Sequence, residues 1–217
     1  MSKRAVVVVD LQNEYLPGGK LALTGIDQAV ANAARVIAHA RETGDAVIHV
    51  RHEFPDPEVP FFNPGTPGVE IMDAVRPGSG EEVVTKNFPN SFLKTGLREM
   101  LDGGGVTDVT VVGAMSHMCI DATVRAASDL GYKVTVVHDA CATLDLEFGG
   151  ATVPAAQVHA AEMARSRSPM RRSRRPTTTR PADLRRRPAS RRRRDVRQEP
   201  TWTRPISSRR SVRSSRS

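Results

Sequence analysis

Three residues whose side chains are suited to acyl-transfer chemistry directly follow predicted strands. Asp10 closes the apolar run "AVVVVD", Lys86 closes "EEVVTK", and Cys119 follows "VTDVTVVGA" where an amphipathic segment begins. Ligands of parallel sheets bind outside the carboxyl ends of the strands, so we expect the three side chains to converge there. The dipole and free N–H groups of a helix N-terminus favour a thiolate. The predicted chemistry is therefore nucleophilic attack by Cys119, with Asp10 as base and Lys86 orienting it.

The segments around these residues alternate between strand and helix patterns, which predicts an α/β fold. The expected form is a Rossmann-like, doubly wound and mostly parallel sheet with helices on both faces. Residues 53–80 are rich in Pro and Gly and are predicted to form a long surface loop with a short helix near 69–75. The predicted strands are 5–10, 45–52, 81–86, 106–114 and 132–140, and the predicted helices are 26–44, 91–104, 118–131 and 153–164.

Composition excludes several classes of protein. The chain has 217 residues, enough for one α/β domain with a sizeable core. Its two cysteines do not make a disulfide framework, which favours a cytoplasmic location. No apolar run reaches the roughly 18 residues of a membrane helix, and no signal peptide is recognisable, so no membrane partner is expected.

The charge divides the chain into two parts. Residues 1–163 carry a net charge of −9, whereas residues 164–217 carry +17, all of it from arginine. The first part is predicted to be the folded domain. The second is rich in Arg, Ser and Pro, a composition typical of disorder. Such a tail would bind nucleic acid only nonspecifically, through phosphate contacts.

Four segments together resemble the isochorismatase-like cysteine hydrolases, the superfamily that includes nicotinamidases and N-carbamoylsarcosine amidase. The resemblance covers about residues 4–163, and the segments have the family's order and spacing. They are "VVVVDLQNEYLPGGKLAL", "TKNFPNSF", "VVGAMSHMCIDATVRAASDLGYKVTVVHDACAT" and "VPAAQVHAA". The family's fold agrees with the α/β fold expected from the alternating pattern.

The resemblance assigns roles to residues by position. It implies that Cys119 is the nucleophile, Asp10 the base and Lys86 the third member of a catalytic triad. It also implies a cis peptide bond between Ala114 and Met115. The backbone N–H groups of Met115 and Cys119 would then form the oxyanion hole.

The resemblance further implies a reaction and its partners. The substrate would be a small amide-like molecule, cleaved through a thioester that water then hydrolyses. The family implies a homo-oligomer if the fold is complete, and no cofactor is expected. The flanks of the motifs supply five candidate substrate-binding residues, namely Gln12, Tyr15, Asn90, Phe92 and His117.

A metal site is not predicted. His49 and His52 are three positions apart, a spacing that suggests a pair of metal ligands, but on a strand their side chains point to opposite faces. The nicotinamidases place an Asp/His metal cluster in this region, and this sequence lacks that pattern. His52 is therefore interpreted as a pocket-rim or structural residue. The second cysteine, Cys141, is interpreted as a buried neutral thiol.

The tail begins inside a predicted helix and contains no lysine, which suggests a reading-frame shift. Permitted codons for residues 164–173, read one frame over, allow "ALAFAYAEV", the helix end and strand that the family carries there. We therefore expect the sixth strand to be missing and the last helix to lose apolar surface at Arg165 and Arg167. Two alternatives to an active hydrolase follow: a noncatalytic nucleic-acid-associated protein acting through the tail, or an inactive frame-shifted product.

Overall fold

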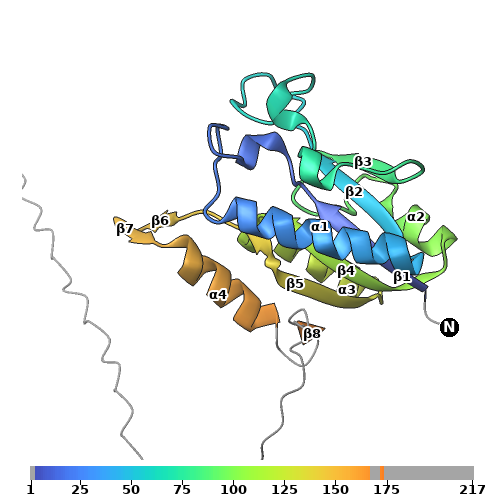
Figure 1. Cartoon of the computed structure of the whole chain (residues 1–217). Coiled ribbons are helices and arrows are strands. Elements are labelled where there is room, and N and C mark those ends of the chain that lie inside the picture. The colour runs from blue at the N-terminus through green and yellow to red at the C-terminus, as the bar shows by residue number, and fades with distance from the viewer. Residues whose placement is uncertain (1–2, 167–171, 174–217) are drawn as a thin grey trace, which may run out of the picture. The chain divides into compact units, whose positions relative to one another are not determined.

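The structure is a computed structural model that describes residues 3–166 and 172–173. A parallel six-stranded sheet forms its centre, in the order β3-β2-β1-β4-β5-β8 (Figure 1). The strands are β1 (Lys3–Val9), β2 (Ala46–His52), β3 (Glu82–Lys86), β4 (Val106–Ala114), β5 (Lys133–Ala142) and β8 (Arg172–Ser173). The predictions of disorder, nucleic-acid binding and a frame shift fall mostly on residues outside the described ranges.

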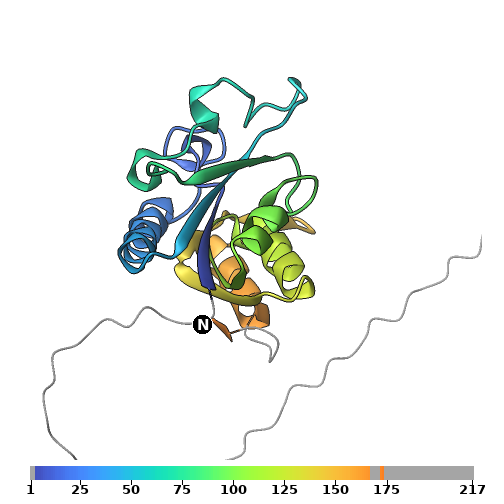
Figure 2. The same cartoon turned by 90° about the vertical axis from the view of Figure 1, so that its right-hand side faces the viewer.

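Helices cover both faces of the sheet, which confirms the predicted fold class. Figures 1 and 2 show α1 (Ile26–Thr43) on one face, with α2 (Leu97–Gly103) and α3 (Asp121–Asp129) on the other. α4 (Ala155–Ser166) is the last helix described. Short turns complete the list: the 3₁₀ segments η1 (Asn13–Tyr15), η2 (Pro67–Val69) and η3 (Asp73–Val75), and the π-helical turn η4 (Ser116–Ile120).

β1 shows why the buried strands read as continuous apolar runs. Val6 and Val8 pack in the cluster that contains the inner face of α1. Val7 and Val9 pack in the opposite cluster, with residues of α2 and α3. Because both faces are covered, every position from 5 to 10 is buried and the alternation seen in a half-exposed strand disappears. Among the described residues, no helix is long and apolar enough to span a membrane.

The sixth strand, which was expected to be missing, is present over two residues only. β8 pairs in parallel with β5, where Arg172 and Ser173 lie opposite Thr135 and Val136. Strand pairing uses backbone groups, so an edge strand accepts a following segment whatever side chains that segment carries. The Arg-rich sequence therefore supplies a short strand at the place of the one expected to be lost.

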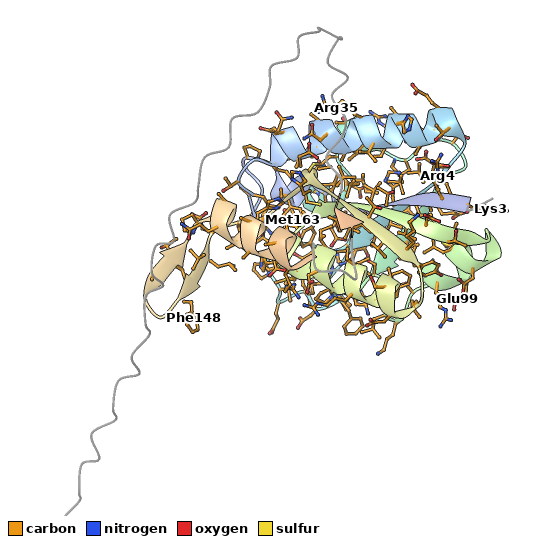
Figure 3. The ribbon with its side chains drawn as sticks, turned by 90° about the horizontal axis from the view of Figure 1, so that it is seen from below. Lys3, Arg4, Arg35, Glu99, Phe148 and Met163 are labelled. Atoms are coloured by element: carbon orange, nitrogen blue, oxygen red, sulfur yellow. The ribbon has the colours of Figure 1, made fainter. Side chains whose placement is uncertain are left out.

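The predicted loss of apolar surface at Arg165 is also wrong. Arg165 is on the exposed side of α4, where its guanidinium lies 2.6 Å from a carboxylate oxygen of Asp121 and also pairs with Glu162. The apolar contact of this turn is made by Met163, which is buried in the cluster with α3 (Figure 3). Helical spacing turns the two side chains in different directions, so the arginine does not displace the methionine. Arg167 lies outside the described residues.

A small antiparallel hairpin was not predicted. It consists of β6 (Leu146–Phe148) and β7 (Ala151–Val153), joined by Gly149 and Gly150, which both have positive φ angles. Two such glycines between short strands are typical of a two-residue hairpin turn, and the "FGGA" motif was the available signal. Phe148 stands at the end of the hairpin with its side chain largely exposed (Figure 3).

The approach of β4 to β1 requires a glycine at position 113. Gly113 has φ +131°, and a Cβ atom there would lie 1.9 Å from the carbonyl oxygen of Val9. We expect Gly113→Ala to lower the free energy of unfolding by about 3 kcal/mol or more, measured by urea denaturation. Gly150→Ala is the control, because its φ is also positive but the space around it is open; it should cost only about 1 kcal/mol. Equal losses in the two variants would contradict the steric argument.

Candidate active site

The candidate site lies at the topological switch point of the sheet. β1 and β4 are neighbours, while the chain continues from β1 to β2 on one side and from β4 to β5 on the other. In such sheets the crevice outside the carboxyl ends of the two diverging strands is the usual ligand position. Asp10 directly follows β1 and Cys119 lies in η4, directly after β4. Lys86 is the last residue of β3, and all three side chains are buried.

The ammonium group of Lys86 joins the predicted residues. Its Nζ lies 2.8 Å from Oδ2 of Asp10 and 3.3 Å from Sγ of Cys119. A third neighbour, Nδ1 of His52, lies 2.8 Å away. The ammonium pairs by charge with the Asp10 carboxylate and donates hydrogen bonds to the His52 nitrogen and the Cys119 sulfur. The structure thus brings together the acid, the amine and the thiol, and adds an imidazole that the sequence analysis had placed at the pocket rim or in a structural role.

The electrostatics of Cys119 differ from the sequence-based expectation. Burial raises the pKa of the Cys119 thiol, the negative charge of Asp10 raises it further, and the positive charge of Lys86 opposes both. Burial also raises the pKa of Asp10, against the effect of Lys86. A helix N-terminus favours a thiolate only if solvation does not dominate, and here burial outweighs the other effects. In the resting form, the Cys119 thiol therefore lies beside the carboxylate–ammonium pair of Asp10 and Lys86.

The turn that carries Cys119 is held from several sides. The Ala114–Met115 peptide bond is cis, at the position that the resemblance implies. The carbonyl oxygen of Met115 accepts hydrogen bonds from the N–H groups of Met118 and Ile120. Ser116 Oγ lies 3.2 Å from the carbonyl oxygen of residue 142 in β5 and 2.8 Å from Nδ1 of the imidazole of residue 159 in α4. The turn of Cys119 therefore depends on β5 and α4 for its position.

Three of the five candidate substrate-binding residues lie near the triad or its turn. Tyr15 is buried, and the pKa of its hydroxyl is raised well above its usual value by burial and then by the nearby Asp10 and Cys119 groups. His117 Nδ1 lies 2.6 Å from the hydroxyl of Thr143, which anchors η4 to the end of β5. Only Tyr15, of these two, is close enough to the reacting groups to interact with their charges.

The third of these residues, Gln12, is used structurally. Both donors of its amide are taken by backbone carbonyls, at 2.9 Å from His52 and 2.7 Å from Val69. Its Oε1 accepts the backbone N–H of His52 at 2.8 Å. Gln12 is fully buried, so the structure assigns it to holding the end of β2 in place. That role takes up its donors, which leaves no N–H for a substrate.

Asn90 and Phe92 contact each other and a neighbouring aromatic ring. Oδ1 of Asn90 accepts the N–H of Phe92 at 2.9 Å, and the ring of Phe92 stacks on that of Tyr132 with centroids 6.1 Å apart. Both residues line a surface hollow of about 380 Å³ together with Leu130. That hollow is beside the far end of α3, roughly 10–15 Å along the helix from Cys119. Although the motif "TKNFPNSF" includes Lys86, the side chains of Asn90 and Phe92 also line a hollow on the surface of the protein.

The same site contains the one group of possible metal ligands found among the described residues. Asp10, His52 and Cys119 each offer a ligand atom, and these atoms lie within 4.8 Å of one another. The Lys86 ammonium contacts one atom of each residue, so it takes the position that a cation would occupy. His49 does not contribute, because its Nε2 lies 3.0 Å from Glu81 instead.

The opposite effects of Asp10 and Lys86 on the thiol can be tested by alkylation. In a Cys141→Ala background, the rate constant for Cys119 with iodoacetamide should keep rising above pH of about 9, because the thiol pKa is raised. Asp10→Asn removes the charge that disfavours the thiolate and should raise the rate constant near neutral pH by about tenfold or more. Lys86→Met should lower it by a similar factor. Rate constants that change in the same direction in both variants would contradict this account.

Comparison with known proteins agrees with the fold. The model of the isochorismatase domain matches residues 4–167. The isochorismatase family protein YddQ of Bacillus subtilis is 49% identical over 160 residues, which cover 74% of this chain and 89% of YddQ. The crystal structure of an isochorismatase from Pseudomonas putida KT2440 superposes with a TM-score of 0.74 at 41% identity, covering 78% of this chain and 86% of that one.

An enzyme named for an amide substrate is also similar. The maleamate amidohydrolase of Pseudomonas putida is 30% identical over 151 residues, which cover 63% of this chain and 71% of that enzyme. The family model spans most of the chain, and its match begins in β1 and reaches past the end of α4. The chain therefore belongs to the isochorismatase family and is a hydrolase.

Proposed function

We propose that this hydrolase cleaves the C–N bond of a small amide-like substrate through a thioester on Cys119. One observation carries the proposal: a single buried ammonium, that of Lys86, contacts both the Asp10 carboxylate and the Cys119 sulfur. An acid and a thiol held in this way can exchange a proton without histidine as the base. The similarity to an amidohydrolase supports an amide as the substrate.

In the first half of the reaction, the thiol proton of Cys119 passes to Asp10 as the sulfur attacks the substrate's carbonyl carbon. The raised pKa of Asp10 suits it to hold that proton. The Met115 and Cys119 N–H groups would stabilise the oxyanion, each by about 3 kcal/mol. Asp10 then protonates the leaving nitrogen, the C–N bond breaks, and the amine departs from a thioester.

In the second half, water replaces the sulfur. Asp10, again a carboxylate, takes a proton from water as its oxygen attacks the thioester carbon. The C–S bond breaks, the acid product forms, and the proton returns from Asp10 to the sulfur. Lys86 keeps its charge throughout, so it stabilises whichever partner, carboxylate or thiolate, is negative. The homo-oligomeric state and the cytoplasmic location expected from the sequence stay predictions.

A panel of small primary amides, ureido acids and carbamoyl compounds tests the proposal, with released amine or ammonia as the readout. Cys119→Ala should lower turnover about 10⁴-fold or more. Cys141→Ala is the matched control. Its thiol is buried in β5, where burial raises its pKa to about 12, and its loss should leave turnover near that of the parent.

The intermediate provides the second readout. Rapid quenching followed by mass spectrometry should find the acyl group on the peptide that contains Cys119. Turnover that survives Cys119→Ala, or an acyl group found only elsewhere, would contradict the proposed mechanism.

A further inference from the structure

His52 is the one group in contact with the Lys86 ammonium to which the proposed mechanism gives no role. Its Nδ1 lies 2.8 Å from Nζ, as close as the Asp10 carboxylate. Because an ammonium only donates, Nδ1 must be the acceptor, and the ring proton is then on Nε2. Burial, and then the charge of Lys86, lower the pKa of His52 to about 3, so the ring is neutral at physiological pH.

The imidazole is held rigidly from two directions. Gln12 binds both backbone groups of His52, through its Oε1 to the N–H and through its Nε2 to the carbonyl. The ring is packed edge-on against two aromatic rings, with centroids 4.4 Å from Phe54 and 5.6 Å from Phe62. A side chain fixed at its backbone and at its ring has little freedom to follow Lys86, so Lys86 must adjust to it.

The sheet explains why Lys86 needs such a guide. β2 lies between β3 and β1, so the Lys86 side chain must cross a whole strand to reach Asp10. Two strand spacings amount to roughly 9–10 Å. His52 is opposite Lys86 in the strand register, on the path that the side chain takes. Holding a long side chain with four rotatable bonds in one geometry costs conformational entropy, and the hydrogen bond to His52 helps to offset that cost.

We propose that His52 is a positioning residue that accepts one N–H of Lys86 and thereby directs the other two at Asp10 and Cys119. This inference rests on the proposed function for its catalytic consequence, but its geometric content concerns Lys86 and Cys119 alone. A neutral acceptor is suited to this role, because it fixes the ammonium without adding a second negative charge that would compete with the thiolate. The remaining two donors then stay on the two groups that exchange the proton.

The test compares two replacements of His52 by the alkylation rate of Cys119, again with Cys141→Ala. The charged and titratable groups that face the sulfur are Asp10, Tyr15, Lys86 and, through Lys86, His52. His52→Leu removes the acceptor and should lower the rate constant near neutral pH about tenfold, moving the pH profile upward. His52→Asn keeps an acceptor oxygen near the Nδ1 position and should restore the rate to within about threefold.

His49→Asn is the matched control. It removes a buried imidazole from the same strand, but one that contacts Glu81 and not Lys86. This variant is expected to lose stability and to keep the pH profile of alkylation unchanged. A shifted profile in His49→Asn, an unchanged profile in His52→Leu, or no recovery in His52→Asn would each overturn the proposal.

Two further measurements distinguish failure of this proposal from misfolding of a variant and from failure of the proposed function. Nitrogen-15 NMR of the histidine rings in the unmodified protein should show His52 Nδ1 without a proton near neutral pH, and a proton on Nδ1 would overturn the proposal even if His52→Leu fails to fold. With a substrate found, His52→Leu should lower kcat more than it raises KM. If no amide in the panel is cleaved but the alkylation rates change as expected, the result would count against the proposed function and not against the positioning role of His52.

Discussion

The site depends on a buried positive charge that must be neutralised and hydrogen-bonded. An ammonium without partners is too costly to keep inside a protein, and breaking a buried pair by removing one partner typically costs 3–5 kcal/mol. Lys86 meets this requirement with partners from three different segments: it pairs by charge with a carboxylate after β1 and donates hydrogen bonds to an imidazole at the end of β2 and a sulfur after β4. The ammonium therefore fixes the carboxyl ends of the central strands relative to one another. It also holds the carboxylate and the thiol close together.

The same arrangement explains how the proposed nucleophile, Cys119, can be buried. Burial raises the pKa of both the Cys119 thiol and the Asp10 carboxyl, so neither is favoured as an isolated anion. A proton shared between two such groups can move with little change in solvation, and the ammonium stabilises either product. The turn that carries Cys119 adds the second requirement, since it is positioned by Gly113 before it and by contacts to β5 and α4 around it.

The sequence contained enough to predict the sheet and the convergence of three side chains at its carboxyl edge. Alternating elements predict parallel strands, and parallel strands place the residues at their carboxyl ends together, so Asp10, Lys86 and Cys119 were expected to meet. The protonation state of the thiol was not predictable, because it depends on burial, which side chains from several segments create. The contact of His52 with Lys86 was not predicted for a related reason. It depends on β2 lying between β3 and β1, and strand order is a property of the fold.

Other differences also have physical causes. Asn90 and Phe92 belong to a motif near the site in sequence, but they also line a surface hollow beside α2 and α3, and Phe92 stacks on Tyr132. β8 was not expected, because side-chain pattern says little about the backbone hydrogen bonds that pair a short strand with a sheet edge.

The central claim is that Asp10 and Lys86 form one coupled unit inside the site. A double-mutant cycle measured by urea denaturation tests it directly, with Asp10→Asn, Lys86→Met and the double variant. The account predicts that each single substitution destabilises the fold by about 3–5 kcal/mol, because it leaves an unpaired buried group. The double variant should then lose at least about 2 kcal/mol less than the sum of the two. Losses that simply add would show that the two side chains do not interact, and would contradict the account.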